Sequence, residues 1–176
     1  MSNEQNWNAI RDVTTSCTVA LFEAYGVDLR PCAGCTVNDE ANVIAAIGFA
    51  GDELRGALAI SMSMDVVRAS NTIAESPTPD QSRDWTGELA NQILGRVKNR
   101  LLRFGAHVGM GTPLVFSGTR FIVHSSKQAP NLRIAFTSEH GPVEVWIDAV
   151  FAPDTLLVES ADDGGTAEEE GTLLFF

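Results

Sequence analysis

The chain has 176 residues and a mass of 18.9 kDa, a length that favours a single domain. Its 44% hydrophobic and 20% charged residues are close to the globular average and exclude wholesale disorder. The 23 acidic residues outnumber the 12 Lys and Arg residues, which gives a net charge of −11. This acidity argues against a nucleic-acid-binding protein, because such proteins need a basic face.

The sequence carries no run of 18 or more apolar residues, so no transmembrane helix is expected. The first six residues are polar and include Glu4, whereas a secretory signal would begin with basic residues and an apolar run. We therefore expect a cytoplasmic protein with no membrane partner.

The first half of the chain alternates between helical and strand-like patterns. Apolar residues at helical spacing predict an amphipathic helix that Gly26 ends. Two apolar segments around a Gly51-Asp52 turn predict a β-hairpin, and Ser63 is expected to cap the short helix after it. The predicted elements are a helix at 7–25, a loop at 27–42, strands at 43–50 and 55–63, and a helix at 65–74.

A long helix and a series of strands are predicted for the second half. The Pro-rich segment 77–80 stops the chain before the helix, for which Asp80 or Ser82 is the expected cap and Gly105 the end. The helix is predicted at 82–104, and strands at 113–117, 120–125, 132–138 and 143–151. The predicted fold class is α+β, in which a mostly antiparallel sheet of about six strands packs against the two long helices.

The composition changes near residue 152. We predict one domain over residues 1–152 and an acidic C-terminal tail over 153–176. Residues 161–171 are small and acidic, so they are expected to be mobile. The apolar end, Leu173–Phe176, could dock on the core, dock on a partner, or remain unattached.

Three cysteines are an odd number, which argues against a disulfide framework. Cys32 and Cys35 form a CxxC, but a zinc site would need two more ligands and no second CxxC is present. We interpret the pair as plain thiols in a loop, with metal binding and redox chemistry as the alternatives. No resident metal site is predicted, and the three histidines are assigned no role.

The predicted helix at 82–104 has two distinct faces. Its apolar residues fall on one side at 100° per residue, whereas a polar stripe lies within about 60° of Glu88 on the other side. Gly95 is unusual on this stripe, because a glycine inside a helix costs about 1 kcal/mol relative to Ala. Close approach of another backbone would explain it. The stripe comprises Asp84, Glu88, Asn91, Gly95, Asn99 and Leu102.

Glu88 and Asn91 lie three residues apart, so their side chains are neighbours on this helix. The carboxylate can accept an ion pair, and the amide can both donate and accept hydrogen bonds and thereby orient a water molecule. The alternative is a solvated helix face with an accidental glycine, because E-x-x-N is a short and common pattern.

The segment Asp84-Trp85-Thr86-Gly87-Glu88-Leu89-Ala90-Asn91-Gln92-Ile93-Leu94-Gly95 resembles the signature helix of the CheC/CheX/FliY family of chemotaxis phosphatases. The strand that begins at Gly56 and the Pro–Gly segment 109–118 also resemble parts of that family. The resemblance extends over about residues 7–151. The first helix lacks a second Glu-x-x-Asn, so the chain is similar to the CheX-like subgroup, whose members have one site and tend to be dimeric.

The resemblance implies an enzyme that dephosphorylates the phospho-aspartate of a CheY-like response-regulator receiver domain. By this likeness the catalytic residues are Glu88, which would pair with the receiver's lysine, and Asn91, which would hold the attacking water. Asp84, Gly95 and Asn99 would contact the partner. The receiver would supply Mg²⁺, so the chain needs no cofactor of its own.

Two further functions remain open at this stage. One is a catalytically silent module that binds receivers through the same helix, and the other is a structural domain whose polar stripe is chance. Four basic residues near the end of the helix either form a solvated end favoured by the helix dipole or steer an acidic partner. These residues are Arg96, Lys98, Arg100 and Arg103.

Overall fold

The computed structural model describes residues 2–35, 42–72, 77–118 and 131–160. Three α-helices and a seven-stranded antiparallel sheet form the architecture over these residues, and this confirms the predicted fold class. The helices are α1 (Ser2–Ala24), α2 (Met64–Ser70) and α3 (Pro79–Leu101), and a 3₁₀ turn, η1 (Leu102–Phe104), follows α3. The strands are β1 (Arg30–Pro31), β2 (Asn42–Ala50), β3 (Leu54–Ser63), β4 (Gly109–Met110), β5 (Leu114–Gly118), β6 (Asn131–Ser138) and β7 (Gly141–Phe151).

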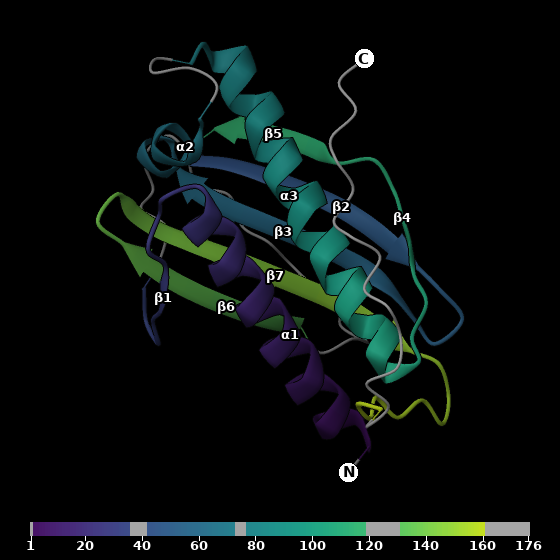
Figure 1. The fold of residues 1–176 in the computed structure, drawn as a ribbon. Coiled ribbons are helices and arrows are strands. Elements are labelled where there is room, and N and C mark those ends of the chain that lie inside the picture. The colour runs from purple at the N-terminus through teal and green to yellow at the C-terminus, as the bar shows by residue number, and fades with distance from the viewer. Residues whose placement is uncertain (1, 36–41, 73–76, 119–130, 161–176) are drawn as a thin grey trace.

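The sheet has the order β1-β6-β7-β3-β2-β4, and β5 also pairs with β2. Helices α1 and α3 lie across the same face of this sheet, and α2 packs at one end (Figure 1). Alternate residues of the long strands point into this helical layer. In one register row, for example, Ile47, Leu58, Ile147 and Leu132 are paired side by side, and all four are buried.

The ends of all three helices differ from the sequence-based prediction. Helix α1 begins at Ser2 and ends at Ala24, whereas the prediction was 7–25. Helix α3 begins at Pro79, and its cap is Thr78 rather than Asp80 or Ser82. The Thr78 hydroxyl accepts a hydrogen bond from the backbone N–H of Gln81, and the side-chain carbonyl oxygen of Gln81 accepts one from the backbone N–H of Thr78. Proline fits the first helical position because its missing N–H has no intrahelical partner there.

Helix α2 ends at Ser70, whereas the prediction extended to residue 74. Its predicted cap is confirmed, since the Ser63 hydroxyl accepts from the backbone N–H of Val66. Gly105 closes the turn after α3 as predicted and has a positive φ of 72°, a conformation that favours glycine.

The predicted loop at 27–42 contains a short edge strand and a disulfide. β1 pairs with β6, and directly after it Cys32 and Cys35 are covalently linked, with Cα atoms 5.7 Å apart. The interpretation of the pair as plain thiols was therefore wrong. A turn at Ala33-Gly34 brings the two cysteines together, and composition alone cannot reveal that proximity.

Residues 153–160 pack against the domain. Leu157 is buried, and the side chain of Asn6 bonds to both Thr155 and Leu157. The predicted strand at 120–125, the acidic segment 161–171 and the apolar end Leu173–Phe176 lie outside the described residues. Within the described part of the chain, no helix is long and apolar enough to cross a membrane.

Candidate functional site

Helix α3 carries the predicted apolar face into the core. Every residue assigned to that face is buried at 3% exposure or less, because the helix packs on α1 and on the sheet at strands β2, β3 and β5. These residues are Leu89, Ala90, Ile93, Leu94, Val97 and Leu101.

The predicted polar stripe lies on the opposite side of α3. Asp84, Asn91 and Asn99 are exposed, whereas Glu88 and Gly95 are half-buried. A Cβ atom added to Gly95 would meet nothing within 4 Å, apart from the helix's own backbone. The fold of the described residues therefore gives no packing reason for this glycine, and the space outside it is open.

Gly87, one residue before Glu88, does have a packing reason. An added Cβ there would lie 3.1 Å from Cγ2 of Val115 and 3.8 Å from Cγ of Pro113. The segment Pro113–Val115 therefore packs closely against α3 at the start of the stripe. In the sequence, Gly87 is recognisable only as part of the family pattern, and no local signal connects it to this contact.

Two further residues that the sequence analysis missed lie beside Glu88. The Gln92 amide Nε2 donates to Glu88 Oε1 at 2.8 Å, and the Tyr25 hydroxyl donates to Gln92 Oε1 at 2.8 Å. The i,i+4 spacing of Glu88 and Gln92 was a signal for the first contact. Tyr25 lies 67 residues away in sequence, and no local pattern could have connected it to Gln92.

The side-chain amide of Asn91 has no hydrogen-bond partner among the described residues. Its exposed amide can both donate and accept, so it is available to a molecule that docks on this face. A carboxylate and an unengaged amide three residues apart on a rigid helix can bind a cation and orient a water molecule side by side.

The basic residues near the end of α3 occupy different environments. Arg103 lies 3.9 Å from the Glu159 carboxylate, so it helps to hold the segment after β7. Arg96 and Arg100 lie near the buried thiol of Cys17 on α1. Burial raises the pKa of that thiol, and the two guanidinium charges oppose the rise.

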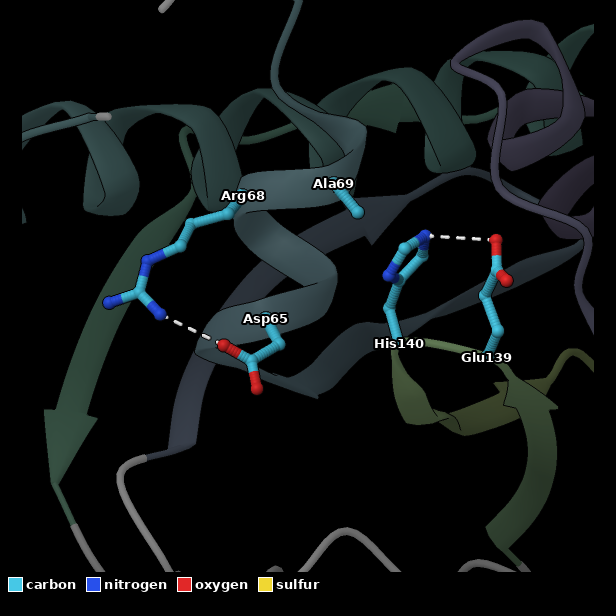
Figure 2. A pocket seen from close by; sticks show the side chains of 5 residues that line it. All are labelled: Asp65, Arg68, Ala69, Glu139 and His140. Carbon is cyan, nitrogen blue, oxygen red and sulfur yellow. Dashed lines mark hydrogen bonds and ion pairs between the residues drawn. The ribbon is translucent and has the colours of Figure 1, made fainter. Parts of the chain in front are cut away.

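A shallow hollow lies between α2 and the turn that joins β6 to β7 (Figure 2). Its polar side chains are paired within their own segments: Arg68 with Asp65 at 2.9 Å, and Nε2 of the His140 imidazole with Glu139 at 3.3 Å. No residue of α3 lines it. Among the described residues, no three His, Cys, Asp or Glu side chains form a group that could hold a metal ion. The candidate site is the polar face of α3, which lies apart from this hollow.

A comparison with protein families matches residues 43–137 to the model described as chemotaxis phosphatase CheX. This match covers more than half of the chain. The chain belongs to the CheX family. The matched region includes β2, β3, the whole of α3 and β5, and therefore all five of the predicted site residues.

Solved structures of CheX proteins share the fold. CheX from Vibrio vulnificus superposes with a TM-score of 0.69 at 19% identity, covering 80% of this chain and 96% of that one. A CheC-like chemotactic protein from Shewanella oneidensis MR-1 gives 0.68 at 23% identity, covering 81% and 98%. CheX in the CheX–CheY–BeF₃–Mg²⁺ complex from Borrelia burgdorferi gives 0.57 at 19% identity, covering 81% and 96%. A search of curated proteins found no significant match to the sequence.

Proposed function

We propose that this chain is a phosphatase for the phospho-aspartate of a CheY-like receiver domain, and that the Glu88/Asn91 face of α3 is its site. The observation that carries the proposal is the side-by-side placement of a carboxylate and an unpartnered, exposed amide on the helix that the CheX family match includes. A CheX of the same fold from Borrelia burgdorferi is found in complex with CheY.

In this proposal, Asn91 acts on the attacking water. The receiver holds an aspartyl phosphate, and hydrolysis forms a new bond from the water oxygen to phosphorus while the bond from phosphorus to the aspartyl oxygen breaks. The products are inorganic phosphate and a free carboxylate. The Asn91 amide accepts from the water and holds it in line with the breaking bond, so catalysis comes mainly from positioning.

Glu88 has a separate task in docking. Its carboxylate pairs with the ammonium group of the receiver's lysine and so fixes the register of α3 against the receiver. Asp84 and Asn99 extend the same contact surface along the helix, and Gly95 leaves room for the receiver backbone. The receiver carries the Mg²⁺ ion that neutralises the phosphoryl oxygens, and this chain contributes no metal ligand to the reaction.

The Asn91→Ala variant tests the site. We expect it to retain receiver binding and to lose about 100-fold or more of the acceleration of dephosphorylation, because the water is no longer positioned. The lifetime of a phosphorylated CheY-like receiver, measured with and without the protein, gives this rate. Asn8→Ala is a matched control, since Asn8 is also an exposed helical asparagine but lies on α1.

The outcomes separate the functions that the sequence leaves open. Wild-type protein that binds the receiver without shortening the phosphate lifetime is a silent binding module. Wild-type protein that neither binds nor accelerates would show that the polar stripe has no role with receivers. An unchanged rate of receiver dephosphorylation in Asn91→Ala would show that Asn91 does not position the water.

A further inference from the structure

Residues of α3 and of the C-terminal end of α1 are linked to the carboxylate of Glu88 by two side-chain hydrogen bonds. From α1 comes Tyr25, the residue directly after the helix, whose hydroxyl donates to Gln92 at 2.8 Å. Gln92 in turn donates to Glu88, also at 2.8 Å. Glu88 and Gln92 both belong to α3, so the first link joins two helices and the second spans one helical turn.

Only one arrangement of donors and acceptors satisfies all three side chains of this hydrogen-bond network. A carboxylate only accepts, so Gln92 must turn its NH₂ group toward Glu88. The carbonyl oxygen of Gln92 then faces Tyr25, whose hydroxyl donates to it. With the amide reversed, the carbonyl oxygen of Gln92 would face the carboxylate and the two would repel. The carboxylate therefore sets the amide orientation, and the Tyr25 hydroxyl supplies the donor that the carbonyl oxygen of Gln92 needs in that orientation.

Tyr25 is itself held in place. Its ring meets the ring of Trp85 edge-to-face, with centroids 4.9 Å apart and an interplanar angle of 77°. The Trp85 indole is buried, and its N–H donates to the hydroxyl of Ser70 at the end of α2 at 3.1 Å. The ring of Tyr25 is thus held by a packing contact in addition to the hydrogen bond of its hydroxyl to Gln92.

This arrangement leaves Glu88 prepared for a partner. Oε1 is engaged by Gln92, and no described residue bonds to Oε2, so one oxygen remains available for a cation. A carboxylate already held in one geometry loses less conformational freedom on binding than a mobile one. Gln92 is itself half-buried, as expected of a supporting group rather than a contact group.

We infer that Gln92 and Tyr25 are positioning residues that act as one unit to hold the Glu88 carboxylate for the partner's cation. The inference rests on the proposed docking role of Glu88. It adds that docking also requires Gln92 and Tyr25, which the E-x-x-N pattern does not include. Gln92 supplies the direct contact, and Tyr25 acts on Glu88 only through Gln92.

The Tyr25→Phe variant removes the hydroxyl and keeps the ring on Trp85. We expect the KM for the phosphorylated receiver to rise about 3- to 10-fold, the range for the loss of a hydrogen bond, with kcat unchanged within about twofold. Gln92→Met, which keeps the length of the side chain but removes the donor, should have an equal or larger effect on KM. The midpoint of thermal unfolding of Tyr25→Phe serves as the control for folding and should fall by no more than the effect of one lost hydrogen bond, because the ring contact with Trp85 is kept.

A double-mutant cycle with Glu88→Ala distinguishes a role of Tyr25 in positioning Glu88 from a general effect on the structure. In the Glu88→Ala background, Tyr25→Phe should change KM no further, because the group that it positions is gone. An equal rise in both backgrounds would overturn the inference, and so would an unchanged KM in the single variant.

A receiver-independent measurement keeps this inference distinct from the proposed function. The side-chain amide resonances of Gln92 in the free protein should shift in both Tyr25→Phe and Glu88→Ala, and unchanged resonances in either variant would overturn the network. If the wild-type protein neither binds nor dephosphorylates receivers, the proposed function fails, and the positioning role fails with it. Shifted resonances would still establish the hydrogen-bond network of Tyr25, Gln92 and Glu88.

Discussion

At the scale of single residues, two glycines of α3 separate packing from docking. Gly87 lies against Val115, whereas the space outside Gly95 is open. Both glycines are helical and only eight positions apart. The same substitution at each therefore compares a position packed inside the fold with a position on the proposed docking face.

Gly95→Leu is expected to fold normally and to lose receiver binding. The new side chain points into open space in the free protein, and replacement of a helical glycine adds up to about 1 kcal/mol of helix propensity. The same side chain would occupy the space that the proposal gives to the receiver backbone. Binding to an immobilised receiver and urea unfolding measure the two effects. Retained binding would show that this face is not the interface.

Gly87→Leu is the matched control, with the opposite pattern for stability. Its side chain would collide with Val115 and Pro113, and overpacking of this kind costs about 1–3 kcal/mol. We therefore expect Gly87→Leu to lower the free energy of unfolding while Gly95→Leu leaves it equal or raised. Equal stabilities for the two variants would contradict the packing argument.

The arrangement of the candidate site was predictable from the sequence only where its residues share a helix. Glu88, Asn91 and Gly95 belong to α3, and a single angular period locates them on one face. Tyr25 was not predictable in the same way, because its contact with Gln92 depends on how α1 packs across the sheet beside α3. Local periodicity describes a helix face but not what a neighbouring helix brings to it.

At the scale of elements, the sequence predicted the long helices and most strands, since their apolar periods are long. The two shortest strands were not predicted, for a physical reason. β1 and β4 have two residues each and exist only because β6 and β2 offer backbone groups to them. The disulfide after β1 was not predicted for a similar reason, because it depends on a turn rather than on composition.

The disulfide gives a direct test at this scale. Without reductant, the folded protein should show almost no reactive thiol, because Cys17 is buried and burial raises the pKa of its thiol, which reduces the reactive thiolate. After unfolding, one thiol per chain should react with a thiol reagent, and reduction should raise the number to all three cysteines. Three reactive thiols on unfolding without reductant would mean that Cys32 and Cys35 are not linked.

At the scale of the whole molecule, the sheet leaves an apolar edge. β5 pairs with β2 on one side, and no described strand pairs with its other side. Leu114 and Phe116 on this strand are 64% and 50% exposed. An exposed, apolar edge strand is a template for pairing with another chain. Helix α3 contacts β5 but turns its polar stripe away from the core, so a partner on this edge would not need the docking face.

We propose that two copies of the chain pair along β5 as a two-fold dimer, with both Glu88/Asn91 faces left open. Two chains of net charge −11 repel one another at long range, so the contact must come from apolar and main-chain groups. Added salt should strengthen the association, because it screens the repulsion.

Light scattering at micromolar concentration should give about twice the chain mass of 18.9 kDa. Leu114→Asp combined with Phe116→Asp should yield monomers, because two more charges at the edge of each chain oppose pairing. Leu156→Asp is the matched control, since Leu156 is 48% exposed but lies outside the sheet, and it should remain dimeric. A monomeric wild-type protein with full phosphatase activity would exclude the dimer and leave the α3 site intact, because Glu88, Gln92 and Tyr25 all come from one chain.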